Sequence, residues 1–394
     1  MSPEFLFKSA LAIALAGMAC AASSATTSRT FPVLIGTYTS GTSAGIYLYA
    51  FDGNSGTIGP APVQVTKTRN PSWLTFSADH RKLYAVQENA PDEKDPEGRA
   101  TAYAVQPETG RLTLINQVAS RGAQPTYAST STDGHFLFVA NYSVRPDPGG
   151  TLAVLPIGAD GALAPVTQVV TPRHTRRDPT TRKPSHVHSS VSSPDGRVVY
   201  VQDLGTDTIH VYRYDASRHD SPLVAMKDQP TIDLPAGSGP RHLTFDADGR
   251  HAYLSLEKTG QVAVFDNDDG LLTRRQMLPL AADGFRGQVA GGAIHLSPDG
   301  RFLYATDRGT DNQLVAFKVD PSTGELTFAG RRSVEGTEPR EFSLDPSGHF
   351  ILVANQHSHQ IVVFRRDPVT GAIGNKVQAL DIDQPSDVKF VNRP

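Results

Sequence analysis

The stretch Ser193-Pro194-Asp195-Gly196-Arg197 is followed at once by the apolar run Val198-Val199-Tyr200. An Asp-Gly pair favours a tight turn, because glycine readily adopts the positive φ angle that many turns require. A short apolar run after such a turn is typical of a strand buried in the core. The stretch therefore predicts a turn that leads directly into a core strand.

Five further copies of this turn-and-strand unit occur along the chain, at spacings of 48 to 62 residues. The sequence between two copies holds about four short strands separated by turn signals, and no window shows a sustained helical period. A repeat of about fifty residues with four strands is typical of a β-propeller blade. The six copies begin at Ser77, Ser131, Ser193, Asp246, Ser297 and Asp345.

The two ends of the chain supply one more blade. Strands expected at residues 33–38 and 45–51 lack a first strand, whereas the tail at residues 384–391 looks like a first strand that then stops. Joining the two ends closes the ring and leaves few unpaired sheet edges. We therefore predict an all-β fold, a seven-bladed β-propeller closed by strands from both termini, with residues 30–392 as its single domain.

The first 25 residues have the pattern of a secretory signal peptide. Lys8 precedes an apolar run at residues 10–16, which is too short to span a membrane, and small residues follow up to Ala25. We predict a signal peptide at residues 1–25, no membrane span, and a secreted, periplasmic protein. A lipoprotein site at Cys20 is the alternative, but Gly17 occupies a position where a large aliphatic residue is expected. Cleavage after Cys20 removes the only cysteine and with it any thiol chemistry.

The composition restricts the partners. The net charge is −3 and 38% of the residues are apolar, which is ordinary for a globular protein. Because the chain has no strongly basic field to hold a phosphate backbone, we expect no nucleic acid partner. We also expect a monomer that binds a small molecule.

Residues that break the repeat indicate where function lies. A propeller scaffold needs only small and apolar residues where the first strand of each blade begins, yet four blades carry histidine or arginine there. First strands converge on the propeller axis, so we expect these side chains to surround one cavity. This expectation treats the stretches 186–189, 239–242, 292–295 and 338–341 as equivalent. The candidates are His186, His188, Arg241, His242, His295 and Arg340.

The strands that leave the turns end in polar residues, among them Glu257 and Arg308, and we expect these ends to face water at the same cavity. Arginine binds carboxylates and stabilises a developing oxyanion, and histidine can act as a general base near neutral pH. These groups suit the opening or closing of a lactone, in which a carbonyl oxygen gains charge and a proton moves.

Other chemistries are less well supported by the residues. His186 and His188 lie two apart on a strand and share a face, but zinc also needs a third ligand and supporting partners that nothing in the sequence specifies. We therefore expect no metal and no cofactor. The Gly-x-Ser-x-Gly match at Gly41–Gly45 leads into an expected strand, not into the helix that a nucleophile elbow requires, and no glycine-rich phosphate loop before a helix is present in the sequence.

The same residues resemble the seven-bladed β-propeller lactonase family over the whole mature chain. This family includes metal-independent 6-phosphogluconolactonases and fungal-type 3-carboxy-cis,cis-muconate lactonizing enzymes. One departure is that the acidic residue that many members carry two positions before the Ile-His histidine is replaced by Ala293. The motifs that carry the resemblance are Ile35–Gly41, His188-Ser189, Asp203–Asp207, Gly239–His242, Ile294–Gly300 and Val353–Gln356.

The resemblance implies catalytic roles for His188, Arg241, Glu257 and Arg340, and we expect His186, His242, His295 and Arg308 to bind substrate. A phosphorylated sugar lactone is a cytosolic metabolite, so an exported enzyme is expected to meet an unphosphorylated lactone. We predict an exported, metal-independent lactonase that hydrolyses a gluconolactone-like sugar-acid lactone. The alternatives are a muconate-type lactonizing cycloisomerase and a non-catalytic propeller that serves as a binding platform.

Overall fold

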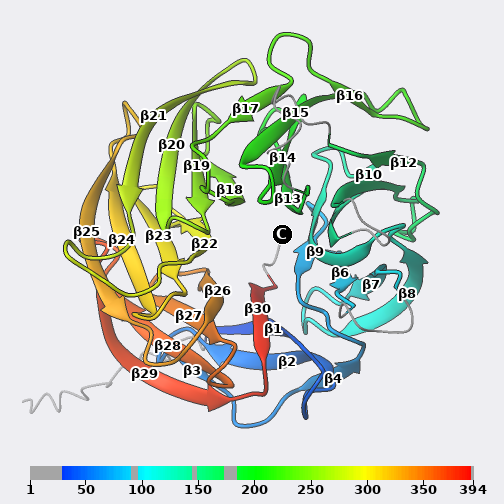
Figure 1. Ribbon diagram of the computed structural model, residues 1–394. Helices are drawn as coiled ribbons and strands as arrows, with labels where there is room; N and C mark the ends of the chain where they lie inside the picture. Colours follow the sequence, from blue (N-terminus) through cyan, green and yellow to red (C-terminus); the bar gives the residue numbers. More distant parts are fainter. Residues whose placement is uncertain (1–28, 90–95, 144–148, 173–183, 392–394) are drawn as a thin grey trace, which may run out of the picture.

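In the computed structural model, seven antiparallel sheets surround a central axis, as predicted from the repeat (Figure 1). The structure describes residues 29–89, 96–143, 149–172 and 184–391. No helix occurs among these residues, so none of them forms a helical membrane span. The predicted signal peptide lies outside the described residues and stays a prediction.

Six blades follow one another along the chain. Within each blade the first strand lies nearest the axis, and the later strands follow outward in sequence order. Blade 1 contains β5 (Leu74–Phe76), β6 (Lys82–Gln87), β7 (Arg99–Val105) and β8 (Leu112–Ala119). Blade 2 contains β9 (Ala123–Thr130), β10 (Phe136–Ser143), β11 (Thr151–Pro156) and β12 (Gln168–Val170). Blade 3 contains β13 (Val187–Ser192), β14 (Val198–Asp203), β15 (Thr208–Tyr214), β16 (Leu223–Ala225) and β17 (Thr231–Asp233).

Blades 4 to 6 repeat this plan with four strands each. Blade 4 contains β18 (Pro240–Phe245), β19 (His251–Leu256), β20 (Gln261–Asp268) and β21 (Leu271–Pro279). Blade 5 contains β22 (Gly291–Leu296), β23 (Phe302–Asp307), β24 (Gln313–Val319) and β25 (Leu326–Ser333). Blade 6 contains β26 (Pro339–Leu344), β27 (Phe350–Asn355), β28 (Gln360–Arg366) and β29 (Ile373–Asp381).

Blade 7 joins the two ends of the chain. The C-terminal β30 (Pro385–Phe390) forms its inner strand and pairs with β1 (Thr30–Thr37), with Val33 opposite Phe390 (Figure 1). The ring of Phe390 packs against that of Phe51, with the ring centroids 5.3 Å apart. The predicted closure by both termini is therefore confirmed. The outer strands are β2 (Gly45–Asp52), β3 (Thr57–Ile58) and β4 (Gln64–Lys67).

The hydrophobic core lies between the blades. Seven buried clusters are present among the described residues, and each combines side chains of two neighbouring blades, such as Phe138 of β10 and Val201 of β14. Because every blade is packed on both sides, the inner strands are held at fixed positions around the axis.

The Asp-Gly turns lie at one end of that axis. In the copy at residues 193–197, the Asp195 carboxylate accepts hydrogen bonds from the Ser193 hydroxyl and the Arg197 amide, and Gly196 has a φ of 73°. Each inner strand runs toward its turn, so the starts of the inner strands lie at the opposite end. We call these two ends of the axis the turn end and the site end.

Candidate active site

Strand register shows which residues of different blades are equivalent. In blades 3 to 6, one ladder pair joins the start of the inner strand to the last residue of the second strand. The residue after that pair is therefore equivalent in all four blades. These residues are His188, Arg241, Gly292 and Arg340. Three of them are predicted catalytic residues, and the register places all three at the site end.

The predicted equivalence of His295 and His242 is wrong. Gly291 pairs with Asp307, as Pro240 pairs with Leu256, so His295 lies two residues further along its strand than predicted. Two strand residues span about 7 Å, which places His295 deeper along the axis. Its Nε2 lies 2.5 Å from Oε1 of the buried Glu341.

The residues at and after the ends of the second strands have two different roles. Glu257 and Arg308, which directly follow β19 and β23, reach the site as predicted. The last strand residues are instead buried, although we predicted that they face water; Asp203, for example, accepts hydrogen bonds from the amides of His186 and Gly205. The buried strand-end residues are Asp203, Asp307 and Asn355, and Asn141 of β10, at the equivalent register position, is buried as well.

Glu257 lies between two arginines. Its Oε2 is 3.1 Å from Nε of Arg241 and 2.7 Å from Nη2 of Arg308. Nη1 of Arg308 is in turn 2.6 Å from Oε1 of Glu338. Glu338 has a φ of 57°, a left-handed conformation that strains a non-glycine residue. These four side chains come from blades 4, 5 and 6 and form one chain of ion pairs.

Arg340 belongs to a second group that includes residues of blades 7 and 1. Its Nη2 lies 3.5 Å from Oε2 of Glu88, and its guanidinium lies over the ring of Tyr38, 5.0 Å from the ring centroid. The Tyr38 hydroxyl donates to the same Glu88 oxygen at 2.7 Å. Burial alone lowers the pKa of Arg340, but the nearby acidic groups outweigh it and raise the pKa, so the guanidinium stays charged.

The three arginines at the site are balanced by three carboxylates. Each of Arg241, Arg308 and Arg340 contacts at least one of Glu88, Glu257 and Glu338. The sequence predicted a cavity surrounded by histidines and arginines, but these six groups, three arginines and three carboxylates, carry no net charge when all are ionised. Glu88 and Glu338 were not recognised in the sequence as site residues, because their partners lie in other blades. This balance disfavours a ligand of high negative charge.

His188 is buried beside these arginines. Its residue is 5% exposed, and its Nδ1 has no hydrogen-bond partner within the described parts of the chain. Burial lowers the pKa of His188 well below its usual value, and the positive charges of Arg241, Arg340 and Arg308 lower it further. The imidazole is therefore neutral at neutral pH and able to accept a proton. Because Nδ1 is buried, Nε2 is the nitrogen available to water.

The imidazole ring of His242 packs against the guanidinium group of Arg241. Nη1 of Arg241 lies 3.2 Å from both ring nitrogens of His242, a position above the face of the imidazole rather than along one lone pair. The ring of His242 is enclosed by Trp73, Tyr127 and His188, with centroids 5.1 to 5.3 Å away. Burial and the Arg241 charge hold the pKa of His242 well below its usual value. A neutral imidazole can stack against the guanidinium without repelling it.

A second group of charged side chains lies deeper along the axis. Nζ of Lys389 is 2.9 Å from Oδ1 of Asp387 and lies over the ring of Trp73, 4.2 Å from its centroid. Burial alone raises the pKa of Glu341, but His295 and Lys389 outweigh it and lower the pKa. Oε2 of Glu341 is 3.9 Å from Nδ1 of His242, which links this group to the site above it.

His186 reaches the site beside His188, through Tyr142. Its ring stacks on that of Tyr142, with centroids 4.6 Å apart, and the Tyr142 ring stands perpendicular to that of His188 at 6.0 Å. Tyr142 was not among the predicted site residues. Its sequence signal was its position at the end of the second strand of blade 2, which corresponds to that of Glu257 in blade 4.

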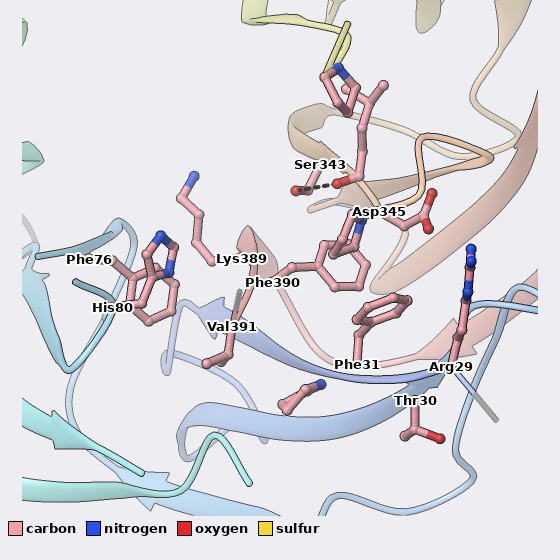
Figure 2. A pocket seen from close by; sticks show the side chains of 14 residues that line it. Arg29, Thr30, Phe31, Phe76, His80, Ser343, Asp345, Lys389, Phe390 and Val391 are labelled. Carbon is pink, nitrogen blue, oxygen red and sulfur yellow. Dashed lines mark hydrogen bonds between the residues drawn. The ribbon is translucent and has the colours of Figure 1, made fainter. Parts of the chain in front are cut away.

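A cavity of about 830 Å³ lies at the turn end, on the other side of the propeller (Figure 2). Its walls include Phe31, Phe76 and Phe390, whereas the ammonium group of Lys389 points away from these rings. None of the predicted site residues lines it. The cavity therefore lies apart from the arginines and histidines that could perform chemistry.

The part of the chain that the structure describes contains no group of three His, Cys, Asp or Glu side chains arranged to hold a metal ion. The histidines at the site lie against arginines, aromatic rings and one carboxylate. The absence of a metal requirement stays a prediction that chelation can test.

A family model described as a seven-bladed β-propeller lactonase matches residues 32–390. The chain belongs to this lactonase family. The resemblance inferred from the motifs is thus confirmed, together with the assignment to a family of lactone hydrolases.

Several relatives of this lactonase-family chain carry more specific names. The periplasmic gluconolactonase of Pseudomonas aeruginosa is 51% identical, with a TM-score of 0.87 over 93% of this chain and 100% of that chain. A structure of a putative 6-phosphogluconolactonase from Bacteroides fragilis is 35% identical, with a TM-score of 0.82 over 93% and 99% of the two chains. A 6-phosphogluconolactonase of Bacillus subtilis is 29% identical over 91% of this chain and 98% of that protein.

Proposed function

We propose that this protein is an exported, metal-independent lactonase that hydrolyses an unphosphorylated sugar-acid lactone of the gluconolactone type. The observation that carries the proposal is that His188 lies buried at the site end, at the position equivalent to Arg241 and Arg340 and in the field of three arginines. Such a group can take a proton from water while the neighbouring cations stabilise negative charge on a carbonyl oxygen. The likeness to a periplasmic gluconolactonase supports the same substrate class and the periplasm.

In the proposed reaction, Nε2 of His188 accepts a proton from a water molecule as the water oxygen bonds to the lactone carbonyl carbon. Arg241 and Arg340 stabilise the resulting oxyanion, and Glu257 holds Arg241 in position. The bond from the carbonyl carbon to the ring oxygen then breaks, and the ring oxygen takes the proton back from His188. The product is the open hydroxy acid, which ionises at neutral pH.

The charge balance of the site supports an unphosphorylated substrate. A 6-phosphorylated lactone brings about two negative charges at pH 7, which call for unpaired cations. Arg241, Arg308 and Arg340 are each already paired with a carboxylate. Binding a phosphate there would place it beside three negative groups. A neutral sugar lactone avoids this repulsion and needs only hydrogen-bond donors and acceptors.

The substrate proposal is tested by comparing D-glucono-δ-lactone with its 6-phosphate as substrates of the mature protein. We expect kcat/KM for the neutral lactone to exceed that for the phosphorylated one by at least about tenfold, the effect of 1.4 kcal/mol of repulsion. A preference for the phosphate would reject the neutral substrate. Conversion of 3-carboxy-cis,cis-muconate without lactone hydrolysis would instead support the cycloisomerase alternative.

Metal independence and export have separate tests. Hydrolysis should be unchanged after dialysis against EDTA, and a loss that zinc, calcium or magnesium restores would contradict the proposal. Fractionation of cells that express the full chain should place the protein in the periplasm with residues 1–25 removed. A chain that keeps its first 25 residues in the cytosol would reject the signal peptide.

A further inference from the structure

The second strand of blade 2 extends further than its equivalents at the site end. β10 has 8 residues, whereas β6, β14, β19, β23 and β27 have 6 each. The additional pairing of Ser143 with Ala123 keeps Tyr142 within a hydrogen-bonded strand. In other blades the equivalent residue follows the strand. Tyr142 therefore presents its side chain at the site end from a rigid element.

Contacts on one side fix the orientation of the Tyr142 ring. It stacks on His186 with an interplanar angle of 17°, and Nδ1 of His186 lies 3.0 Å from the Tyr142 carbonyl oxygen. The amide of His186 donates to the buried Asp203 carboxylate at 2.8 Å. These two contacts hold His186 in place, so the stacked rings of His186 and Tyr142 form a wall beside His188.

The phenol hydroxyl of Tyr142 lies in the field of the ion-pair network. Burial raises the pKa of this hydroxyl, Glu257 and Glu88 raise it further, and Arg308 lowers it. The hydroxyl is therefore protonated at neutral pH and can donate a hydrogen bond. No hydrogen bond of this hydroxyl is formed within the described residues, whereas the hydroxyl of Tyr38 donates to Glu88. Tyr142 thus offers a donor that none of the described residues accepts from.

We infer that Tyr142 is a specificity residue: its hydroxyl donates a hydrogen bond to a hydroxyl group of the sugar lactone, and its ring forms a wall against the sugar carbons. This inference rests on the proposed lactonase function and adds the way the site selects hydroxylated lactones. In the proposed reaction Arg241 and Arg340 stabilise the carbonyl oxygen, so the hydroxyl of Tyr142 is left to bind another group of the lactone. Aromatic rings with a polar end suit ligands that have both an apolar face and hydroxyl groups.

The test compares Tyr142→Phe with the wild type on two substrates, D-glucono-δ-lactone and δ-valerolactone, which has the same ring without hydroxyl groups. The control is Tyr253→Phe, which removes a buried hydroxyl of blade 4 that has no hydrogen-bond partner in the described chain. If the protein does not hydrolyse δ-valerolactone, its inhibition constant, measured as a competitor of gluconolactone hydrolysis, is compared in place of KM.

We expect Tyr142→Phe to raise KM for gluconolactone about three- to tenfold, the effect of one net hydrogen bond, with kcat changed less than about twofold. The δ-valerolactone constant and both constants of Tyr253→Phe should stay within about twofold of the wild type. Equal losses on both lactones, a loss confined to kcat, or no change on gluconolactone would each overturn the inference. If the wild type hydrolyses no lactone, the proposed function fails instead, which distinguishes the two claims.

Discussion

Arg308 and Glu257 are joined by a 2.7 Å ion pair, and the Glu257 oxygen that forms it is also the one that accepts from Arg241. Arg308 therefore restrains the carboxylate that holds a proposed catalytic arginine. Its other terminal nitrogen lies 2.6 Å from Glu338. Through these contacts a residue of blade 5 sets the geometry of a group in blade 4.

Replacing Arg308 by methionine should lower kcat/KM for gluconolactone about 10- to 100-fold. The change removes the bridge and leaves two largely buried carboxylates without this partner, so Glu257 no longer holds Arg241 in one position. Arg308→Lys should recover only part of the loss, because one ammonium cannot span two carboxylates as a guanidinium does. The matched control is Arg301→Met, an exposed turn-end arginine paired with Asp299, which should keep wild-type kinetics. Arg308→Met kinetics equal to those of this control would contradict the role.

The pH dependence of hydrolysis should lack the usual histidine inflection. Burial and the three arginines hold the pKa of His188 well below 6.5, so its neutral, proton-accepting form persists as pH falls through 6.5. At high pH, burial and the charge of Arg308 lower the pKa of Arg241 to about 9. Enzymatic kcat/KM should therefore be flat across pH 6 to 8 and decline near pH 9, because the Arg241 cation is lost. Initial rates corrected for spontaneous hydrolysis measure this, and a half-maximal rate at pH 6.5 would contradict the assignment of His188.

Glu257→Gln should move the alkaline decline to lower pH. The Glu257 carboxylate stabilises the charged form of Arg241 and so raises its pKa, and removing that charge lowers the pKa below about 9. The variant should also lose about tenfold in kcat/KM at pH 7.5. Glu325→Gln, on an exposed loop of blade 5, is the control with the same change of charge. A decline at unchanged pH would show that Arg241 does not govern the alkaline limb.

The closure of the ring gives a prediction for stability. Phe390 is 6% exposed and packs against Phe31 and Phe51, so Phe390→Ala should lower the free energy of unfolding by about 3–5 kcal/mol. Phe328 of β25 is 52% exposed, and Phe328→Ala should cost less than about 1 kcal/mol. Urea denaturation followed by circular dichroism measures both. Equal losses would mean that β30 does not stabilise the closed ring.

The sequence predicted the fold because the Asp-Gly turns are local signals. Each turn needs a residue of positive φ, as at Gly196 and Gly300, and the spacing of the copies then determines the blades. His188, Arg241 and Arg340 were identified because polar residues at the start of an inner strand interrupt the repeat. Their equivalence in the structure follows from the strand register.

The errors arose where a position depends on pairing between strands or between blades. His295 was misplaced because blade 5 begins its inner strand with Gly291-Gly292, and only the pairing with β23 shows where that strand starts. Glu88 and Glu338 were missed because their partners lie in other blades. Charge balance at a site assembled from several blades is therefore not visible in the order of residues along the chain.

The central claim is that His188 activates water for lactone hydrolysis. It is tested most directly by the initial rate of D-glucono-δ-lactone hydrolysis for the wild type, His188→Ala and the exposed control His219→Ala, each corrected for the uncatalysed rate. We predict that His188→Ala lowers kcat by a factor of about 100 to 10,000 while thermal unfolding and the rate of His219→Ala stay as in the wild type. A folded His188→Ala protein that hydrolyses the lactone at the wild-type rate would contradict the account.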